Sequence, residues 1–157
     1  PSYIKEFTVL INGKEIQAKD YMRKGYLYLE RTWNHDVVEI RFELAVRKIY
    51  AIQKVREDAG CTALMRGPFV YCFEGKDNGP DLQACHIAED MKAEAFAIEE
   101  GMLKGLTGIH VDGWKYTGSD ELYSEEKPHK EKIRLTAIPY YAWGNRGENK
   151  MRVWMLE

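Results

Sequence analysis

The chain has 157 residues, of which 45% are hydrophobic and 31% charged. A chain of this length buries roughly 70% of its unfolded surface, which excludes a disulfide-dependent miniprotein and a disordered tail. Its 23 Lys and Arg residues nearly balance 25 Asp and Glu residues, for a net charge of −2. No basic surface favours DNA, RNA or anionic lipid, and no apolar run approaches the ~18 residues of a membrane span, so we expect neither a nucleic-acid nor a membrane partner.

The three cysteines, Cys61, Cys72 and Cys85, are odd in number and form no C-x-x-C pair. We therefore expect reduced, buried thiols instead of a disulfide framework. Structural zinc sites draw their ligands from close pairs, and only Cys85 and His86 are neighbours, so we expect no metal and no cofactor. The cysteine count favours a reducing compartment, and we expect a cytoplasmic location.

The amino-terminal residues predict a β-hairpin. Residues 7–11 form an apolar run that leads into Asn12-Gly13, the residue pair most typical of a two-residue hairpin turn, and residues 14–16 would be the return strand.

A second hairpin is predicted from residues 26–33 and 38–46, joined by the turn residues Asn34-His35-Asp36. From 38 to 46 apolar residues take every second position and mainly charged residues stand between them. This alternation predicts a strand with one buried and one exposed face, which is typical of an antiparallel sheet.

The middle of the chain predicts a further hairpin from residues 62–65 and 69–74 around Gly67-Pro68, with the proline at a strand start or an edge. Residues 76–81 are expected to form a loop. Residues 89–100 fit a helix and a strand equally well, and both alternatives stay open.

The last third of the chain predicts strands at residues 106–111, 133–138 and 151–155. Residues 119–132 carry mixed charge and few apolar side chains, so we expect a solvated loop.

Short strands separated by Gly and Pro turns indicate an all-β fold. We predict an antiparallel β-sandwich, jelly-roll-like, of about eight to ten strands with at most one short helix. Residues 1–157 are expected to form this sandwich as a single domain.

No catalytic motif is present: the chain lacks a nucleophile elbow, a phosphate loop and a zinc-protease motif. The four histidines are scattered in the sequence. Glu39 and Glu43 share one strand face, but the alternation explains them as its solvent side, so no glycosidase carboxylate pair is marked out.

The most distinctive local sequence runs from Pro139 to Gly147 and contains three aromatic residues beside a polar turn. Aromatic rings beside polar groups can stack on sugars, but aromatics pack in cores and interfaces far more often. We therefore predict a carbohydrate-binding or interdomain surface formed by Tyr140, Tyr141, Trp143, Asn145 and Arg146.

Three sequence blocks resemble bacterial β-L-arabinofuranosidase-type proteins of glycoside hydrolase family 127. Residues 63–75 (ALMRGPFVYCFEG), followed by Asp77-Asn78, are similar to one block, and residues 135–147 (LTAIPYYAWGNRG), followed by MRVW at 151–154, are similar to the carboxy-terminal block. The third is Gly25 to Leu29 with Trp33 and the alternating strand.

The resemblance implies that this chain is the β-sandwich tail of a longer protein whose (α/α)-barrel carries a cysteine nucleophile and a zinc site. Nothing here matches that barrel, so no catalytic residue is carried over, and Cys72 matches a packing position. A chain without an initial methionine fits such a carboxy-terminal fragment. The partners expected are the parent's catalytic barrel, a second copy of this chain, or carbohydrate.

Two functions compete on this basis. The first is a non-catalytic accessory or structural domain of a β-L-arabinofuranosidase-type hydrolase. The alternative is an autonomous carbohydrate-binding module that uses Tyr140, Tyr141 and Trp143 as stacking platforms. We expect this chain itself not to be an enzyme, because no activated nucleophile or acid–base pair can be named.

Overall fold

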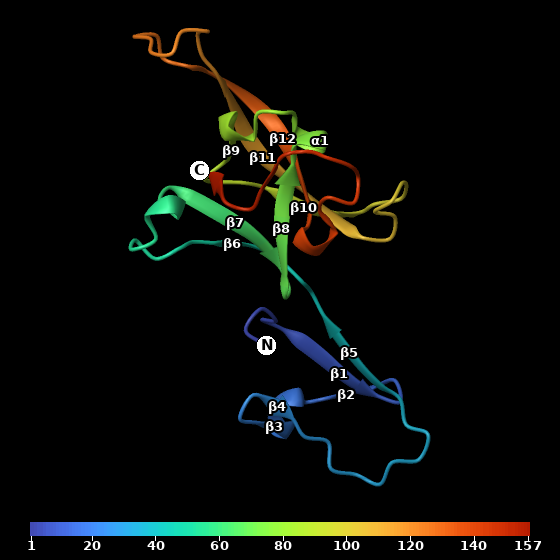
Figure 1. Ribbon diagram of the computed structural model, residues 1–157. Coiled ribbons are helices and arrows are strands. Elements are labelled where there is room, and N and C mark those ends of the chain that lie inside the picture. Colours follow the sequence, from blue (N-terminus) through green and yellow to red (C-terminus); the bar gives the residue numbers. More distant parts are fainter. The chain divides into compact units, whose positions relative to one another are not determined.

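The computed structural model describes residues 1–157 and consists mostly of β-strands (Figure 1). Its one α-helix is the four-residue α1 (Gly75–Asn78), and no helix is long and apolar enough to cross a membrane. Short 3-10 turns lie at Ala18–Tyr21, Arg56–Asp58, Leu82–Ala84 and Tyr140–Ala142. The chain divides into two compact units, residues 1–45 and residues 46–157. A single domain over residues 1–157 stays a prediction.

The first predicted hairpin is confirmed. β1 (Phe7–Ile11) pairs antiparallel with β2 (Lys14–Ile16). Asn12 and Gly13 join the two strands with φ values of 51° and 76°. Both turn residues lie in the left-handed region, which asparagine and glycine adopt at the lowest cost.

The second predicted hairpin is wrong. β4 (Tyr26–Leu27) pairs with β3 (Met22–Arg23), and β5 (Val38–Phe42) pairs with β1 in a three-stranded sheet of order β2-β1-β5. A tight turn at Lys24 and Gly25, with φ values of 49° and 81°, closes the local pair β3–β4. The predicted strand at residues 38–46 is also interrupted after Phe42.

The expected burial of the alternating strand is wrong as well. The register places Val38, Ile40 and Phe42 opposite Ile11, Val9 and Phe7, so these apolar residues share one face of the sheet. Val38, Ile40 and Phe42 are nevertheless 38%, 49% and 47% exposed. We call this surface, formed by Phe7, Val38, Ile40 and Phe42, the apolar sheet face.

The second unit is built from the strands that follow residue 45. They are β6 (Val46–Ile49), β7 (Cys61–Arg66), β8 (Phe69–Glu74), β9 (Cys85–Ile87), β10 (Ala93–Ala97), β11 (Thr107–Thr117), β12 (His129–Pro139), β13 (Met151–Arg152) and β14 (Met155–Leu156). The pair β7–β8 confirms the predicted hairpin around Gly67-Pro68.

The predicted antiparallel sandwich is wrong, because six of these strands close into a mixed barrel. Following the pairs from β7 through β8, β12, β11, β9 and β14 leads back to β7. All these pairs are antiparallel except β9–β14, which is parallel. The closing strand β14 is only two residues long, which is too short to show the alternation of apolar and polar residues that predicts a strand.

Alternate side chains of the barrel strands point inward. Tyr71 and Phe73 of β8 and Ile109 and Val111 of β11 belong to one buried cluster. The remaining members of this cluster include Leu64, Ile87, Leu135, Ala137 and Met155. Inward-facing apolar residues from all six strands therefore fill the barrel, as expected for a barrel of this small size.

A second buried cluster lies on the outer side of the same strands. Cys72 of β8 and Ile138 of β12 alternate with inward-facing residues and pack with Leu103 and Ala142. Leu103 belongs to the loop between β10 and β11, and Ala142 to the turn after β12. These two segments cover the outer face of the barrel at the strands that carry the family-like blocks.

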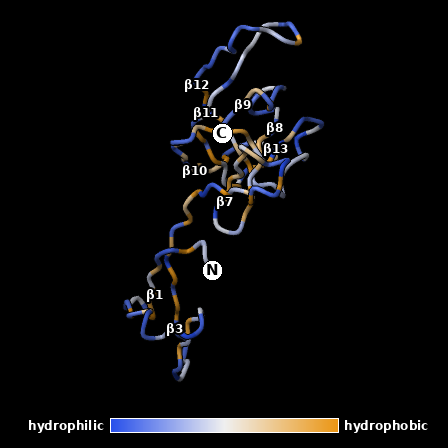
Figure 2. Tube along the Cα trace, turned by 90° about the vertical axis from the view of Figure 1, so that its left-hand side faces the viewer, coloured by the Kyte–Doolittle hydropathy of each residue, from blue (hydrophilic) through white to orange (hydrophobic).

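Three further expectations are settled by the strands. Residues 89–100 contain the strand β10, so of the two alternatives, helix and strand, the strand is correct. The predicted loop at 119–132 is too long, because β12 begins at His129. The predicted strand at 151–155 is two short strands instead, β13 and β14. The loop between β11 and β12 is mostly hydrophilic, as Figure 2 shows.

Candidate functional site

The predicted aromatic residues lie at the end of β12. Tyr140 and Tyr141 belong to the 3-10 turn Tyr140–Ala142, and Trp143 follows it. The three side chains are 45%, 60% and 42% exposed. Tyr141 meets Phe69 edge to face with ring centroids 5.5 Å apart. We call Tyr140, Tyr141, Trp143 and Phe69 the aromatic surface.

Arg146 is placed differently from the three aromatics, because it is mostly buried and fixed by two carboxylates. Its Nε donates to Glu74 Oε2 at 3.0 Å, and its Nη1 donates to Asp77 Oδ1 at 2.8 Å. Nη2 is shared between the two carboxylates. These bonds raise the pKa of Arg146, led by the bond to Asp77. We call Glu74, Asp77 and Arg146 the buried ion cluster.

Glu74 is fully buried and its carboxylate is completely satisfied. Besides Arg146, it accepts hydrogen bonds from the Gly144 backbone N–H at 3.0 Å and from Asn149 Nδ2 at 3.2 Å. Burial raises the pKa of this carboxyl, but the hydrogen bonds outweigh burial and hold it below its ordinary value of 4.5. The carboxylate is therefore charged at neutral pH and stabilises the loop after β12.

Neighbouring polar residues tie the same two segments together. Asn78 Nδ2 donates to the carbonyls of Glu74 and Thr136, each at 2.9 Å, and Asn78 Oδ1 accepts from the Thr136 N–H at 2.7 Å. Asn145 Nδ2 donates to the Ala142 carbonyl at 3.1 Å, which holds its own turn. The hydrogen bonds of Arg146 and Asn145 thus hold together segments of this domain.

A groove of about 250 Å³ lies beside the buried ion cluster. It is lined by Asp77, Phe96, Ile98, Glu100, Gly101, Met102, Leu103, Thr136, Ile138 and Arg146. Of the five predicted site residues only Arg146 lines it. Asp77, Thr136 and Ile138 belong to the family-like blocks, but no motif marks the lining residues between 96 and 103 or connects the three segments.

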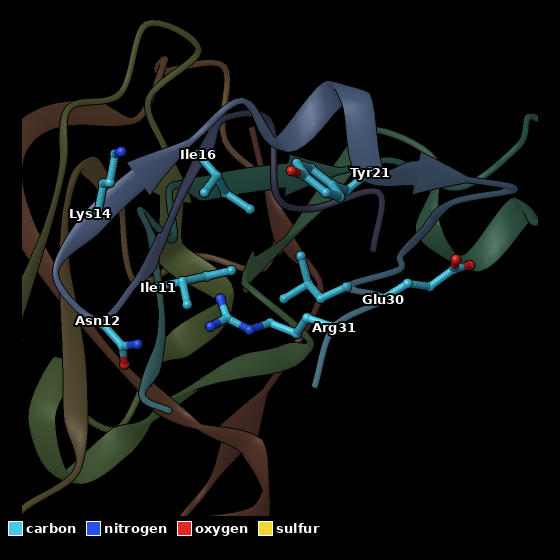
Figure 3. A pocket seen from close by; sticks show the side chains of 8 residues that line it. Ile11, Asn12, Lys14, Ile16, Tyr21, Glu30 and Arg31 are labelled. Atoms are coloured by element: carbon cyan, nitrogen blue, oxygen red, sulfur yellow. The ribbon is translucent and has the colours of Figure 1, made fainter. Parts of the chain in front are cut away.

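A larger hollow, of about 460 Å³, lies within residues 1–45 (Figure 3). Ile11, Ile16 and Arg31 point toward a common space, whereas Lys14 and Glu30 point outward. Arg31 is already bound to Asp36 at 2.9 Å, and Ile11 and Ile16 lie on the face of the sheet that carries the apolar sheet face. The hollow is therefore a continuation of that surface.

The cysteines and carboxylates elsewhere in the chain show no arrangement typical of a catalytic or metal site. All three cysteines are free and buried, and burial raises the pKa of Cys72 to about 12 and also raises that of Cys85. A nucleophilic cysteine needs a low pKa, so the raised pKa values of Cys72 and Cys85 disfavour a nucleophilic role for these two thiols. No group of three His, Cys, Asp or Glu residues could hold a metal ion. Glu39 pairs with Arg41 of its own strand at 2.6 Å.

Comparison with known proteins identifies the family. The family model of the glycoside hydrolase family 127 C-terminal domain matches residues 46–156. The chain belongs to glycoside hydrolase family 127. This confirms the resemblance drawn from the three sequence blocks, and the match corresponds to the second unit of the structure.

The family 127 relatives are much longer than this chain. The non-reducing end β-L-arabinofuranosidase of Bifidobacterium longum is 33% identical over 156 residues, which cover 94% of this chain and 23% of that protein. The crystal structure of a family 127 β-L-arabinofuranosidase from Geobacillus stearothermophilus T6 matches with a TM-score of 0.87 and 40% identity, over 98% of this chain and 25% of that one. A third structure, described as a family 127 β-arabinofuranosidase, has a TM-score of 0.84 and 32% identity, over 97% and 23%. The chain thus spans about a quarter of its relatives.

The buried ion cluster joins two of the family-like blocks. Glu74, Asp77 and Asn78 belong to the first block, and Arg146 belongs to the carboxy-terminal block. The charges of one block are neutralised by the other. Arg146, one of the residues that suggested a ligand site, thus forms structural ion pairs within this domain.

Proposed function

We propose that this chain is a non-catalytic accessory domain of a family 127 β-L-arabinofuranosidase, which supports a catalytic part located elsewhere in the enzyme. The observation that carries the proposal is its extent: it belongs to the family yet covers about a quarter of each relative. Its own groups fit this role, because the thiols of Cys72 and Cys85 have raised pKa values and the buried carboxylate of Glu74 is neutralised by Arg146.

The apolar sheet face and the aromatic surface are the contact surfaces that we propose for the remainder of the enzyme, including its catalytic (α/α)-barrel. A sheet with one apolar face normally buries that face against another element. Phe42 and Ile40 are about half exposed, as is Trp143 at the other surface. Exposed apolar patches of this kind mark interaction sites.

Turnover by the isolated chain tests the proposal. The 157-residue chain is incubated with an aryl β-L-arabinofuranoside beside the Bifidobacterium relative, and release of the aryl group is followed. We expect hydrolysis by the relative and none above the buffer rate by this chain. Hydrolysis at a rate within tenfold of the relative would refute the non-catalytic role.

A deletion in a relative tests the supporting role. The region of the Geobacillus enzyme that matches this chain is removed, and thermal unfolding of the remainder is compared with that of the intact enzyme. We expect a lower melting temperature and aggregation, because the contact surfaces on the remainder become exposed. An unchanged melting temperature and full activity would show that the domain supports nothing.

A further inference from the structure

The groove beside the buried ion cluster lies on the outer face of the barrel. Thr136 and Ile138 of β12 line it, together with Phe96 of β10 and the pair Asp77 and Arg146. Because the sheet order is β10-β11-β12-β8, these groups reach the groove from both sides of β12. Its volume of about 250 Å³ holds one small ring instead of a drug-sized ligand.

Phe96 is held in a fixed position across β11. Its ring is stacked on His110, with centroids 4.0 Å apart and an interplanar angle of 8°. The ring also covers Gly108, where an added Cβ would lie 2.5 Å from Phe96 Cζ. A side chain at position 108 would therefore displace the ring. The Phe96 ring that lines the groove is therefore pre-organised, which lowers the entropy cost of binding.

The opposite side of the groove presents a fixed donor beside a fixed acceptor. A guanidinium has five N–H groups. Four hydrogen bonds join those of Arg146 to Glu74 and Asp77, which leaves one N–H of Nη1. Each Asp77 oxygen accepts one of these bonds and keeps a further lone pair. A hydroxyl group can use either site, because it both donates and accepts.

The charges at the groove disfavour an anionic ligand. Two carboxylates, Asp77 and Glu100, face it against one guanidinium that is already paired twice. An anion would be repelled, and no cluster of three His, Cys, Asp or Glu residues exists to hold a metal cation. A sugar ring has the required combination of a flat C–H face and adjacent hydroxyls.

We propose that the groove binds one neutral sugar ring, with its C–H face on Phe96 and neighbouring hydroxyls on Asp77 and Arg146. Only the choice of an arabinofuranoside as probe rests on the proposed function. A ligand of about ten heavy atoms on an open site reaches only a millimolar dissociation constant. On an accessory domain such a site holds one residue of a glycan and raises its local concentration.

Titration of the 157-residue chain tests this site by NMR. Methyl β-L-arabinofuranoside is added up to about 100 mM, and the amide signals of Gly101 and Met102 are followed, with glycerol as the control additive. We expect saturable shifts with the sugar at millimolar concentration and none with glycerol. Absence of saturation, or the same shifts with glycerol, would overturn the proposal.

Matched variants locate the site. Phe96→Leu removes the ring but keeps an apolar side chain, and Asp77→Asn removes the carboxylate; each should weaken binding at least fivefold. Glu99→Gln, an exposed residue outside the groove lining, and Trp143→Ala, on the aromatic surface, should leave it unchanged. Loss of binding in Trp143→Ala with retention in Phe96→Leu would transfer the site to the aromatic surface and refute ours. Turnover is absent from this assay, so the accessory role stands or fails separately.

Discussion

The two units of this chain use the same residue types with opposite results. In residues 1–45 only Val9 and Leu10 are buried apolar residues, whereas the barrel unit buries a continuous cluster that includes Tyr71, Phe73 and Leu135. Both contain alternating strands. The difference is closure: the barrel strands pair in a ring, whereas the sheet β2-β1-β5 has two free edges and an apolar face on which Val38, Ile40 and Phe42 stay 38–49% exposed. The alternation of apolar and polar residues thus indicates which face of a strand is apolar, and the sheet topology determines whether that face is buried.

The barrel unit should be most sensitive at its buried ion cluster. Glu74→Ala leaves Arg146 without its buried partner and the Gly144 N–H without an acceptor, which should cost about 3–5 kcal/mol of unfolding free energy. Urea unfolding followed by tryptophan fluorescence measures it. The control Glu94→Ala breaks an ion pair whose side chains are 72% and 56% exposed and should cost about 0–1 kcal/mol. Equal losses in the two variants would contradict this account.

Truncation within the barrel should cost slightly less. Leu64 is fully buried, so Leu64→Ala should lower the unfolding free energy by about 2–5 kcal/mol through lost burial and the cavity that remains. Leu122→Ala, at a residue that is 88% exposed in the loop between β11 and β12, should change it by less than about 0.5 kcal/mol. A similar midpoint for both variants would mean that the barrel interior is not a packed core.

A backbone approach inside the ring gives a third, smaller effect. A Cβ at Gly113 would lie 2.5 Å from the His86 carbonyl oxygen and 2.7 Å from Leu135 Cδ1. The β9 backbone cannot move away without opening the barrel, so Gly113→Ala should cost about 1–3 kcal/mol. Gly118→Ala is the control, since its nearest contact would be 4.0 Å away at Pro128. Thermal unfolding of both variants measures the difference.

Acid should remove part of the stability that Glu74 provides. Its folded pKa is lowered, so its contribution is complete above the unfolded value of 4.5 and is lost as pH falls through the folded pKa. The unfolding free energy of the native chain should therefore fall more steeply below pH 4.5 than that of Glu74→Gln. Denaturant titrations at several pH values test this, and parallel curves would show that the carboxylate is not the acid-sensitive group.

The sequence predicts local pairs well and long-range closure poorly. The turn chemistry of Asn12-Gly13 and Gly67-Pro68 specifies two hairpins, and both are present. β5 pairs with β1, from which it is separated by many residues in the sequence. No turn residue specifies which strand β5 pairs with. The barrel likewise depends on the two-residue strand β14, too short for any periodicity.

The candidate site divides in the same way. The resemblance located Arg146 in one block and Glu74 and Asp77 in another, but no pattern in the sequence indicates that these residues are in contact. Only the structure brings the three together. Phe96 could not be found at all, because its role depends on Gly108 and His110 of a neighbouring strand.

The smallest effect on stability is expected at the apolar sheet face, where the effect on association should be large. The double variant Ile40→Thr, Phe42→Thr places a β-branched strand former at both positions and removes apolar side chains that are about half exposed. Because little burial is lost, the unfolding free energy should change by about 1 kcal/mol or less. We expect the native chain to self-associate through this exposed patch as its concentration rises and the double variant to remain monomeric, as measured by sedimentation velocity. Glu39→Ala, on the opposite face of β5, is the control and should leave association unchanged. If the double variant instead unfolds residues 1–45, seen as a loss of Trp33 near-ultraviolet signal, this face belongs to a core of its own and needs no partner to cover it.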